Sequence, residues 1–252
     1  MDLTGRTALV TGVSRRAGIG FAIARQLRDA GAAVFVQGWT SHDAVQPWGA
    51  EPGGTEAVAG ELGVPFVEAD FADPAAPAEV IAVARDALGP LDLLIVNHAR
   101  SGRGGLGELT ANEIDAFLHE NVRASLLLVQ EFATQHDDAR GGGRVILFTS
   151  GQHLAPMSRE VAYAVSKGAL HQATRTLAEE LADRHITVNT VNPGPTDTGW
   201  GLGNQDPGRF MPFGRWGGPD DAARLVAWLC SDDARWITGQ VIDSEGGFRR
   251  WV

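Results

Sequence analysis

The sequence has only one cysteine, Cys230, and one tyrosine, Tyr163, in 252 residues. A lone cysteine excludes an intrachain disulfide framework. The chain also lacks an apolar run near the roughly 20 residues that a membrane-spanning helix needs. It starts without the basic segment and apolar core of a secretory signal. These absences predict a cytoplasmic protein with no membrane anchor.

Positive charge is scarce as well. Lysine and arginine total 21 against 31 aspartates and glutamates, which gives a formal net charge of -10. This balance disfavours nonspecific binding to nucleic acid or anionic membranes, so we expect neither as a partner. Hydrophobic residues at 44% and charged residues at 21% are typical of a packed globular protein. We expect residues 1–252 to form a single domain, because α/β chains of this size often build one core.

Short aliphatic runs alternate with longer stretches in which apolar residues recur every three or four positions. The predicted strands are Thr7–Thr11, Ala33–Val36, Val64–Ala69, Leu91–Asn97, Arg144–Ser150, Ile186–Val191 and Gln240–Asp243. The predicted helices are Ile19–Ala30, Thr55–Leu62, Ala75–Leu88, Ala111–Phe132, Val161–Arg184 and Asp220–Leu229. This alternation predicts an α/β fold: one doubly wound, Rossmann-like domain with a seven-stranded parallel sheet and helices on both faces.

Three segments interrupt the alternation, and each follows a predicted strand. They are Thr40–Gly54, Ser101–Gly107 and Pro193–Gly218, which are rich in glycine, proline, tryptophan or polar residues. In open α/β sheets ligands bind beyond the carboxyl ends of the strands. We therefore expect the functional site among these segments.

Glycines follow the first predicted strand at Gly12, Gly18 and Gly20, just before a helix. Glycine lets the backbone turn tightly and approach a pyrophosphate, while the helix N-terminus offers free N–H donors. The alternative is a tight turn that binds no ligand. A strand before the glycines and a helix after them favour the phosphate site.

The lone tyrosine lies four residues before Lys167, so the two side chains share one face of a predicted helix. A nearby ammonium favours the phenolate form of tyrosine, which makes Tyr163 a usable acid or base. On its own, such a pair also fits an exposed helix face. Ser150, at the end of the fifth predicted strand, lies 163 − 150 = 13 residues before the tyrosine.

The glycine turn, Ser150, Tyr163-Ala-Val-Ser-Lys167 and the later Asn192-Pro-Gly-Pro-Thr-Asp-Thr198 occur in one order along the chain. Together they resemble the short-chain dehydrogenase/reductase family, in its branch of about 250 residues. The resemblance covers essentially the whole chain. Within this branch the chain resembles members of the 3-oxoacyl-carrier-protein reductase type.

The resemblance implies a role for each matching side chain. Tyr163 would be the general acid and base, and Ser150 would hydrogen-bond the reacting oxygen. Lys167 would lower the tyrosine pKa and bind the nicotinamide ribose, and Asn121 would help hold a proton-relay water. The implied reaction transfers hydride between NAD(P) and a ketone or secondary alcohol.

The cofactor-binding positions that the resemblance implies lie along most of the chain. They are Gly12, Ser14, Arg15, Arg16, Gly18, Ile19, Gly20, Thr40, Asp70, Phe71, Asn97, Ala99, Tyr163, Lys167, Pro193, Gly194, Thr196 and Thr198. Without the resemblance, Asp70 would fit a surface aspartate at a strand end equally well. His98 and Arg100 depart from the family's N-N-A-G sequence, so we expect a rearranged loop there.

The expected cofactor is NADP(H) rather than NAD(H), although NAD(H) remains an alternative. NAD-binding members of the family carry an acid after the second strand, and none stands near Gly38. Arg15 and Arg16 could pair with the 2′-phosphate, and Thr40 could add a hydroxyl donor. Solvent-facing arginines, or a pocket reshaped by Asp43, are the alternatives. The histidines show no metal-ligand spacing, so no metal is expected.

The leading function is therefore NADPH-dependent reduction of a small-molecule carbonyl compound. The alternatives are a catalytically weak dinucleotide-binding regulator and an enzyme for 3-oxoacyl thioesters. In the family, residues 193–218 would form a substrate lid, whose Trp200, Phe210, Met211, Phe213 and Trp216 fit an aromatic substrate or merely anchor the loop. The family also implies a homotetramer or homodimer.

Overall fold

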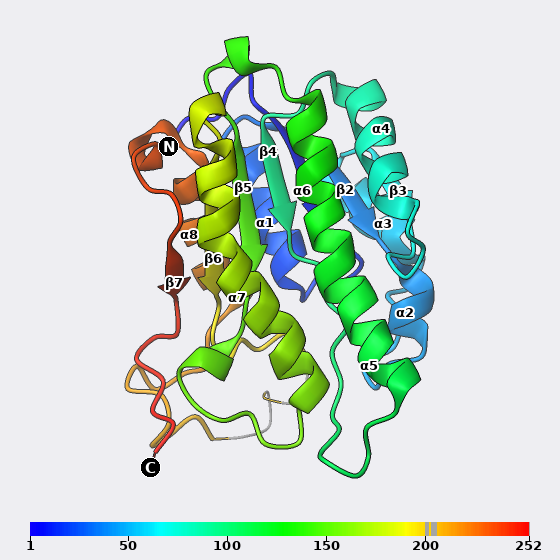
Figure 1. Ribbon diagram of the computed structural model, residues 1–252, viewed down its shortest axis with the longest axis vertical. Coiled ribbons are helices and arrows are strands. Elements are labelled where there is room, and N and C mark those ends of the chain that lie inside the picture. The colour runs from blue at the N-terminus through cyan, green and yellow to red at the C-terminus, as the bar shows by residue number, and fades with distance from the viewer. Residues whose placement is uncertain (200–201, 203–205, 252) are drawn as a thin grey trace.

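The seven strands form one sheet in which every neighbouring pair is parallel (Figure 1). The computed structural model describes residues 1–199, 202 and 206–251. The strands are β1 (Thr7–Thr11), β2 (Ala33–Gly38), β3 (Phe66–Glu68), β4 (Leu93–Val96), β5 (Arg144–Phe148), β6 (Thr187–Asn192) and β7 (Val241–Asp243), in the order β3-β2-β1-β4-β5-β6-β7. The predicted doubly wound, Rossmann-like fold is confirmed.

Helices cover both faces of the sheet. The main ones are α1 (Ile19–Asp29), α2 (Thr40–Ala44), α3 (Gly54–Leu62), α4 (Ala76–Leu88), α5 (Ala111–Phe117), α6 (Ala124–Gln135), α7 (Val161–Leu181) and α8 (Pro219–Cys230). Apolar residues of α1, α3 and α8 join one core cluster, and those of α4, α6 and α7 join the other. Figure 1 shows α4, α6 and α7 in front of the sheet and α1 behind it.

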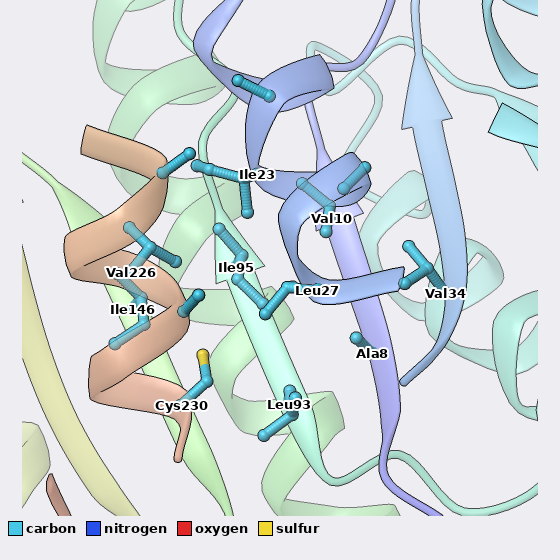
Figure 2. Packing of buried hydrophobic residues seen from close by; sticks show 14 of the residues in the cluster. Ala8, Val10, Ile23, Leu27, Val34, Leu93, Ile95, Ile146, Val226 and Cys230 are labelled. Atoms are coloured by element: carbon cyan, nitrogen blue, oxygen red, sulfur yellow. The ribbon is translucent and has the colours of Figure 1, made fainter. Parts of the chain in front are cut away.

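The two cores follow from the alternation of side chains along each strand. In β1, Ala8 and Val10 point to one face, where they share a core with Ile23 of α1; in the same core Val226 of α8 lies beside Ile146 of β5 (Figure 2). Leu9 points to the opposite face and joins the second core. Since both faces are covered, β1 is apolar and buried over its inner positions, as parallel sheets require.

Two helical features differ from the sequence prediction. The short helix α2 begins within Thr40–Gly54, a segment expected to be irregular. The predicted helix Ala111–Phe132 is interrupted by a π-helical segment, Leu118–Arg123, between α5 and α6. This segment buries Asn121, whose carbonyl oxygen accepts from the Ser125 hydroxyl at 2.6 Å. Single π turns inside helices are common near functional sites.

A buried aspartate fastens the amino end of the sheet. Asp92 is fully buried and accepts hydrogen bonds from the Thr7 backbone N–H at 2.9 Å and from Arg140 at 2.8 and 2.9 Å. Burial acts to raise the pKa of Asp92, but the hydrogen bonds from Arg140 and Thr7 outweigh it and lower this pKa. The carboxylate is therefore held ionised where β1 and β4 begin.

The opposite, carboxyl ends of the strands meet at the lower edge of the sheet in Figure 1. The segments that follow β1, β2, β4, β5 and β6 gather there, together with the C-terminal tail. Across the ranges that the structure describes, no helix is both long enough and apolar enough to cross a membrane.

Candidate active site

Two glycines make the turn after β1 compact. Gly12 has a φ of +72°, and a Cβ there would lie 2.8 Å from the backbone of His98. A Cβ on Gly20 would lie 2.5 Å from the Gly12 carbonyl oxygen and 2.7 Å from Asn97 Nδ2. Only glycine fits these two positions without displacing the backbone. The turn therefore lies directly against the segment after β4.

Asn97 and His98 brace this turn from the end of β4. Asn97 Nδ2 donates to the carbonyl oxygens of Thr11 and Gly12 at 3.0 and 3.1 Å. His98 Nε2 lies 3.0 Å from the Glu120 carbonyl oxygen, and its Nδ1 lies 2.9 Å from the Thr11 hydroxyl. A carbonyl only accepts, so Nε2 carries the proton and Nδ1 accepts. Burial lowers the pKa of His98 to about 3, which keeps the ring neutral.

Arg100 is the other departure from the family's sequence, and its backbone does not adopt a left-handed conformation. Its N–H donates to Asn121 Oδ1 at 2.7 Å, and its guanidinium pairs with Glu120 at 2.9 Å. A glycine is thus not required at this position. His98 and Arg100 bind the loop to the π-helical segment instead.

A cavity of about 240 Å³ opens beside the glycine turn. It extends over the carboxyl ends of β1, β2, β3 and β4. Of the predicted cofactor-binding positions, ten line it: Gly12, Ser14, Arg15, Gly18, Ile19, Asp70, Phe71, Asn97, Ala99 and Thr198. Residues distant in the sequence therefore converge on one elongated space.

Arg15 reaches the end of this cavity that lies beyond β2. Its Nη1 donates to the Thr198 carbonyl oxygen at 2.9 Å, and its Nε lies 3.5 Å from Asp43 Oδ1. The guanidinium carbon lies 4.8 Å from the centre of the Trp48 ring. Burial lowers the pKa of Arg15, while Asp43 and Glu51 act in the opposite direction. The charge is held in place by groups from two segments, Thr40–Gly54 and the loop after β6.

Arg16 and Thr40 do not line this cavity. Arg16 forms ion pairs with Glu51 at 2.9 Å and Glu61 at 2.5 Å on the exposed side of the turn. The Thr40 hydroxyl accepts from the Thr55 backbone N–H at 2.9 Å and also contacts Glu68. Thr40 thus supports the start of α3, and of the two arginines only Arg15 faces the cavity.

Ser150, Tyr163 and Lys167 come together where β5 meets α7. Ser150 and Tyr163 both line a second cavity of about 580 Å³, and the Ser150 hydroxyl lies close enough to the tyrosine to act on its pKa. Lys167 lies behind the tyrosine, where its Nζ is 5.9 Å from the ring centre and donates to the Phe148 carbonyl oxygen at 3.1 Å. The i, i+4 spacing has placed the pair on one helix face.

The ionisation of this group differs from the sequence expectation in one respect. Burial raises the pKa of Tyr163 to about 12, although the Ser150 hydrogen bond lowers it and Glu160 raises it further. Burial also lowers the pKa of Lys167 to about 8. The expectation that Lys167 lowers the tyrosine pKa is therefore corrected for the protein alone, in which burial dominates.

Asn121 lies near this group but outside both cavities. Its Nδ2 donates to Ser166 Oγ at 2.9 Å and to the Arg100 carbonyl oxygen at 3.0 Å, while its Oδ1 accepts from the Arg100 N–H. Ser166 in turn donates to the Tyr163 carbonyl oxygen at 2.8 Å. In this arrangement Asn121 joins the π-helical segment to the helix that carries the tyrosine.

The second cavity adjoins the first, since Ile19, Ser101 and Thr198 line both. Tyr163, Gly194 and Thr196 are the other predicted cofactor positions in its wall. Gly20, Lys167 and Pro193 line neither cavity: Gly20 packs under the turn, Lys167 lies behind Tyr163, and Pro193 belongs to the loop after β6.

The large apolar residues of the predicted lid differ in their surroundings, and Phe213 is mostly exposed. The rings of Phe210 and Trp216 are stacked with centres 6.5 Å apart, and Met211 is buried. The Phe210 carbonyl oxygen accepts from the Arg249 N–H at 2.8 Å. Trp200 lies outside the described residues, and none of the other lid aromatics lines the second cavity.

The cavities also contain residues that the sequence did not single out. Gln37 is buried in β2, and its Oε1 accepts from the Gly12 N–H at 3.1 Å. Trp39 and His42 line the first cavity near Arg15. Of these three residues, only Gln37 could have been recognised from the sequence, because it is a glutamine in an otherwise apolar strand. Among the residues that the structure describes, no group of three or more histidine, cysteine or acidic side chains could hold a metal ion.

This arrangement defines a class of protein: an α/β oxidoreductase in which a cleft beside a glycine turn leads to a Ser-Tyr-Lys group. Comparisons with known proteins agree. A family profile described as Enoyl-(Acyl carrier protein) reductase matches residues 12–249. An uncharacterised oxidoreductase of Bacillus subtilis is 41% identical over 249 residues, which span 97% of each protein.

Solved structures extend this result to three dimensions. A doubly substituted short-chain dehydrogenase/reductase of Serratia marcescens has a TM-score of 0.86 at 34% identity, covering 98% of this chain and 99% of that one. A blue fluorescent protein from a metagenomic library, in complex with NADPH, has a TM-score of 0.85 at 32% identity, with coverage of 98% and 99%. The chain belongs to the short-chain dehydrogenase/reductase family, and it is an NAD(P)-dependent oxidoreductase.

Proposed function

We propose that the protein reduces a ketone to a secondary alcohol with NADPH, using Ser150, Tyr163 and Lys167. The observation that carries this proposal is the continuity of the two cavities. The first begins at the phosphate-type glycine turn, and Ser150 and Tyr163 both line the second. A dinucleotide in the first would have its reactive end near these hydroxyls.

The lining of the first cavity fits a dinucleotide. Gly12 and Gly20 let the turn after β1 pack closely against the segment after β4, and the start of α1 supplies free N–H groups for a pyrophosphate. Asp70 and Phe71 would meet the adenine end. When bound, the nicotinamide group supplies or accepts the hydride. The chain itself therefore has to bind the substrate and handle its proton.

Tyr163 is suited to donate that proton. With its pKa raised to about 12, the phenol is protonated at neutral pH, which is the form that a general acid needs for ketone reduction. Ser150 would hydrogen-bond the same substrate oxygen and stabilise the charge that develops on it. Lys167, with a pKa lowered to about 8, would restore a proton from behind the ring.

We further propose that Arg15 selects NADP(H) over NAD(H). Arg15 lines the cavity beyond β2, where no acidic residue stands at Gly38 or Trp39. Asp43 lines the same end, but its Oδ1 already accepts from Trp48 Nε1 at 2.8 Å and faces Arg15. The guanidinium would pair with the 2′-phosphate. The NADPH complex of a structural relative supports this assignment.

Arg15→Ala and Arg16→Ala form a matched pair for this test, because the two arginines are neighbours and only one faces the cavity. Arg15→Ala should lower kcat/KM for NADPH by about tenfold or more, the size of one lost charge-assisted hydrogen bond of about 1.4 kcal/mol. Its kcat/KM for NADH should change little, and Arg16→Ala should resemble the wild type with both. A wild type that prefers NADH would reject the assignment.

Tyr163→Phe tests the reaction itself. A panel of ketones and alcohols is followed through nicotinamide absorbance, and the variant should nearly abolish turnover while it still binds NADPH and folds. Near wild-type kcat in the folded variant would exclude Tyr163 as the acid. If the wild type reduces none of the ketones in the panel, a regulatory dinucleotide-binding protein would be favoured instead.

Several sequence expectations stay predictions. These are the single domain 1–252 with a lid at residues 193–218, the homotetramer or homodimer, the cytoplasmic location, and the absence of nucleic-acid partners. Light scattering at micromolar concentration would decide the oligomeric state: a particle of 26.7 kDa would be the monomer.

A further inference from the structure

An arginine from the C-terminal tail lies beside the reacting centre. Arg250 lines the second cavity, and a Cβ on Gly151 would lie only 2.7 Å from its Nη2 atom. Gly151 directly follows Ser150 in the chain. The guanidinium is therefore within about one residue's length of the serine that faces the reacting oxygen.

Other residues hold this guanidinium in a fixed position. Arg250 pairs with Glu245, and the side chains are 15% and 8% exposed. Glu245 Oε1 also accepts from Asn192 Nδ2 at 2.7 Å. The guanidinium carbon lies 4.9 Å from the centre of the Phe248 ring. Both partners are thus oriented by neighbours from β6 and the tail.

Stability alone does not explain such a pair. Removing two charges from water is costly, and apolar residues of similar volume often stabilise a protein as well or better. One of the five N–H donors of the guanidinium is engaged by Glu245, and no other acceptor is seen within the described part of the chain. Donors remain that could meet a ligand in the cavity.

We propose that Arg250 recognises a second, uncharged oxygen on the substrate, close to the carbonyl that is reduced. This inference rests on the proposed reductase function and names its substrate class: ketones that carry an additional hydroxyl or carbonyl oxygen. The guanidinium donates to that oxygen while Ser150 and Tyr163 bind the reacting one. Two fixed points would then orient the ketone.

The charges of the cavity decide between an uncharged oxygen and a carboxylate. Its charged lining residues are Glu160, Glu245 and Arg250, so the positive charge is already neutralised and one acid is in excess. A substrate carboxylate would add negative charge to a partly buried space. An uncharged oxygen accepts the same hydrogen bond without this repulsion.

The other residues of the cavity wall indicate the polarity and size of the substrate that would fit. Met157, Phe248 and Trp251 contribute apolar surface, and the volume of about 580 Å³ lies within the range of small-molecule sites. The cavity therefore fits a mainly apolar ketone with its oxygens at one end.

Two ketones that differ by one hydroxyl provide the test: 4-hydroxy-4-phenyl-2-butanone and 4-phenyl-2-butanone. Isothermal titration of each into the NADP+ complex measures affinity without turnover. We expect the wild type to bind the hydroxyketone about tenfold more tightly than 4-phenyl-2-butanone. This difference corresponds to one net hydrogen bond to a charged group. Arg250→Gln should remove this difference and change the affinity for 4-phenyl-2-butanone less than twofold.

Two more variants separate recognition from structure. Arg249→Gln alters an exposed arginine of the same tail and should leave both affinities unchanged. Arg250→Gln combined with Glu245→Gln avoids an unpaired buried carboxylate and should show the same selective loss as Arg250→Gln alone. Equal losses for both ketones, no loss, or no detectable hydroxyketone binding would overturn the proposal.

A third compound tests the preference for an uncharged oxygen. Tighter binding of 3-oxo-3-phenylpropanoate than of the hydroxyketone would overturn that assignment. Turnover is measured separately, with 4-phenyl-2-butanone and NADPH. A wild type that reduces neither this ketone nor any other ketone of the panel refutes the reductase function, whereas the binding comparison still decides the role of Arg250.

Discussion

Lys167 is the only lysine of the chain, and it is buried at a cost to stability. The residue is 2% exposed, and burial lowers its pKa from 10.5 to about 8. The chain thus keeps an ammonium in an apolar place that would favour a neutral side chain. We expect Lys167→Met to make the folded protein more stable at pH 7.

The size of the effect follows from proton linkage. Because the folded pKa is depressed, the protein with lysine is most stable above the unfolded pKa of 10.5. It loses stability as the pH falls toward the folded pKa of about 8. At pH 7 the loss is about 3 kcal/mol, at about 1.4 kcal/mol for each pKa unit. Methionine also lacks the hydrogen bond to the Phe148 carbonyl, which costs the variant about 1 kcal/mol. The free energy of unfolding of Lys167→Met should therefore exceed that of the wild type by about 2 kcal/mol.

Urea unfolding of both proteins at pH 7 and pH 10.5 measures the difference. The gain of about 2 kcal/mol should vanish or change sign at pH 10.5, where the native lysine is neutral. Turnover of the variant should fall at both pH values. This result would show that Lys167 serves the reaction although it destabilises the folded protein. A variant that is less stable at pH 7, or a difference independent of pH, would refute the reasoning.

Three further outcomes are expected. Gly20→Ala should weaken NADPH binding and lower the melting temperature, because its Cβ would lie 2.5 Å from a carbonyl oxygen; unchanged scanning fluorimetry would contradict this. Asp92→Asn should lower the free energy of unfolding in urea by about 3 kcal/mol at pH 7, because Arg140 loses a buried partner; a loss below about 1 kcal/mol would count against it. Burial mainly raises the pKa of Tyr163, and Glu160 adds to it, so Glu160→Gln should shift the 295 nm titration of this lone tyrosine to lower pH; an unmoved midpoint would argue otherwise.

Patterns carried by a few neighbouring residues were enough to predict the sheet. The alternation of apolar runs located all seven strands, with bounds that differ from the structure by no more than a few residues. That Tyr163 and Lys167 lie on one helix face was predictable from their i, i+4 spacing, whereas only the resemblance brought Ser150 to them. The resemblance to a known family then gave these residues their roles.

Features that depend on distant contacts were not predictable in the same way. Arg15 and Arg16 are equivalent in the sequence, and only the positions of Asp43 and Glu61 separate them in space. Arg250 reaches the cavity because the tail folds back over Gly151. The raised pKa of the tyrosine has the same origin, since burial is a property of the whole fold.

The two ends of the sheet offer different opportunities to a protein engineer. Parallel strands send all the cavity-lining loops to one edge, while the carboxylate of Asp92 and the guanidinium of Arg140 lie at the other. Stabilising changes introduced at the amino edge would leave the geometry of the cavities untouched, because separate segments build the two edges. Mutant libraries aimed at new substrates can accordingly be confined to the carboxyl edge, on a scaffold strengthened beforehand from the other side.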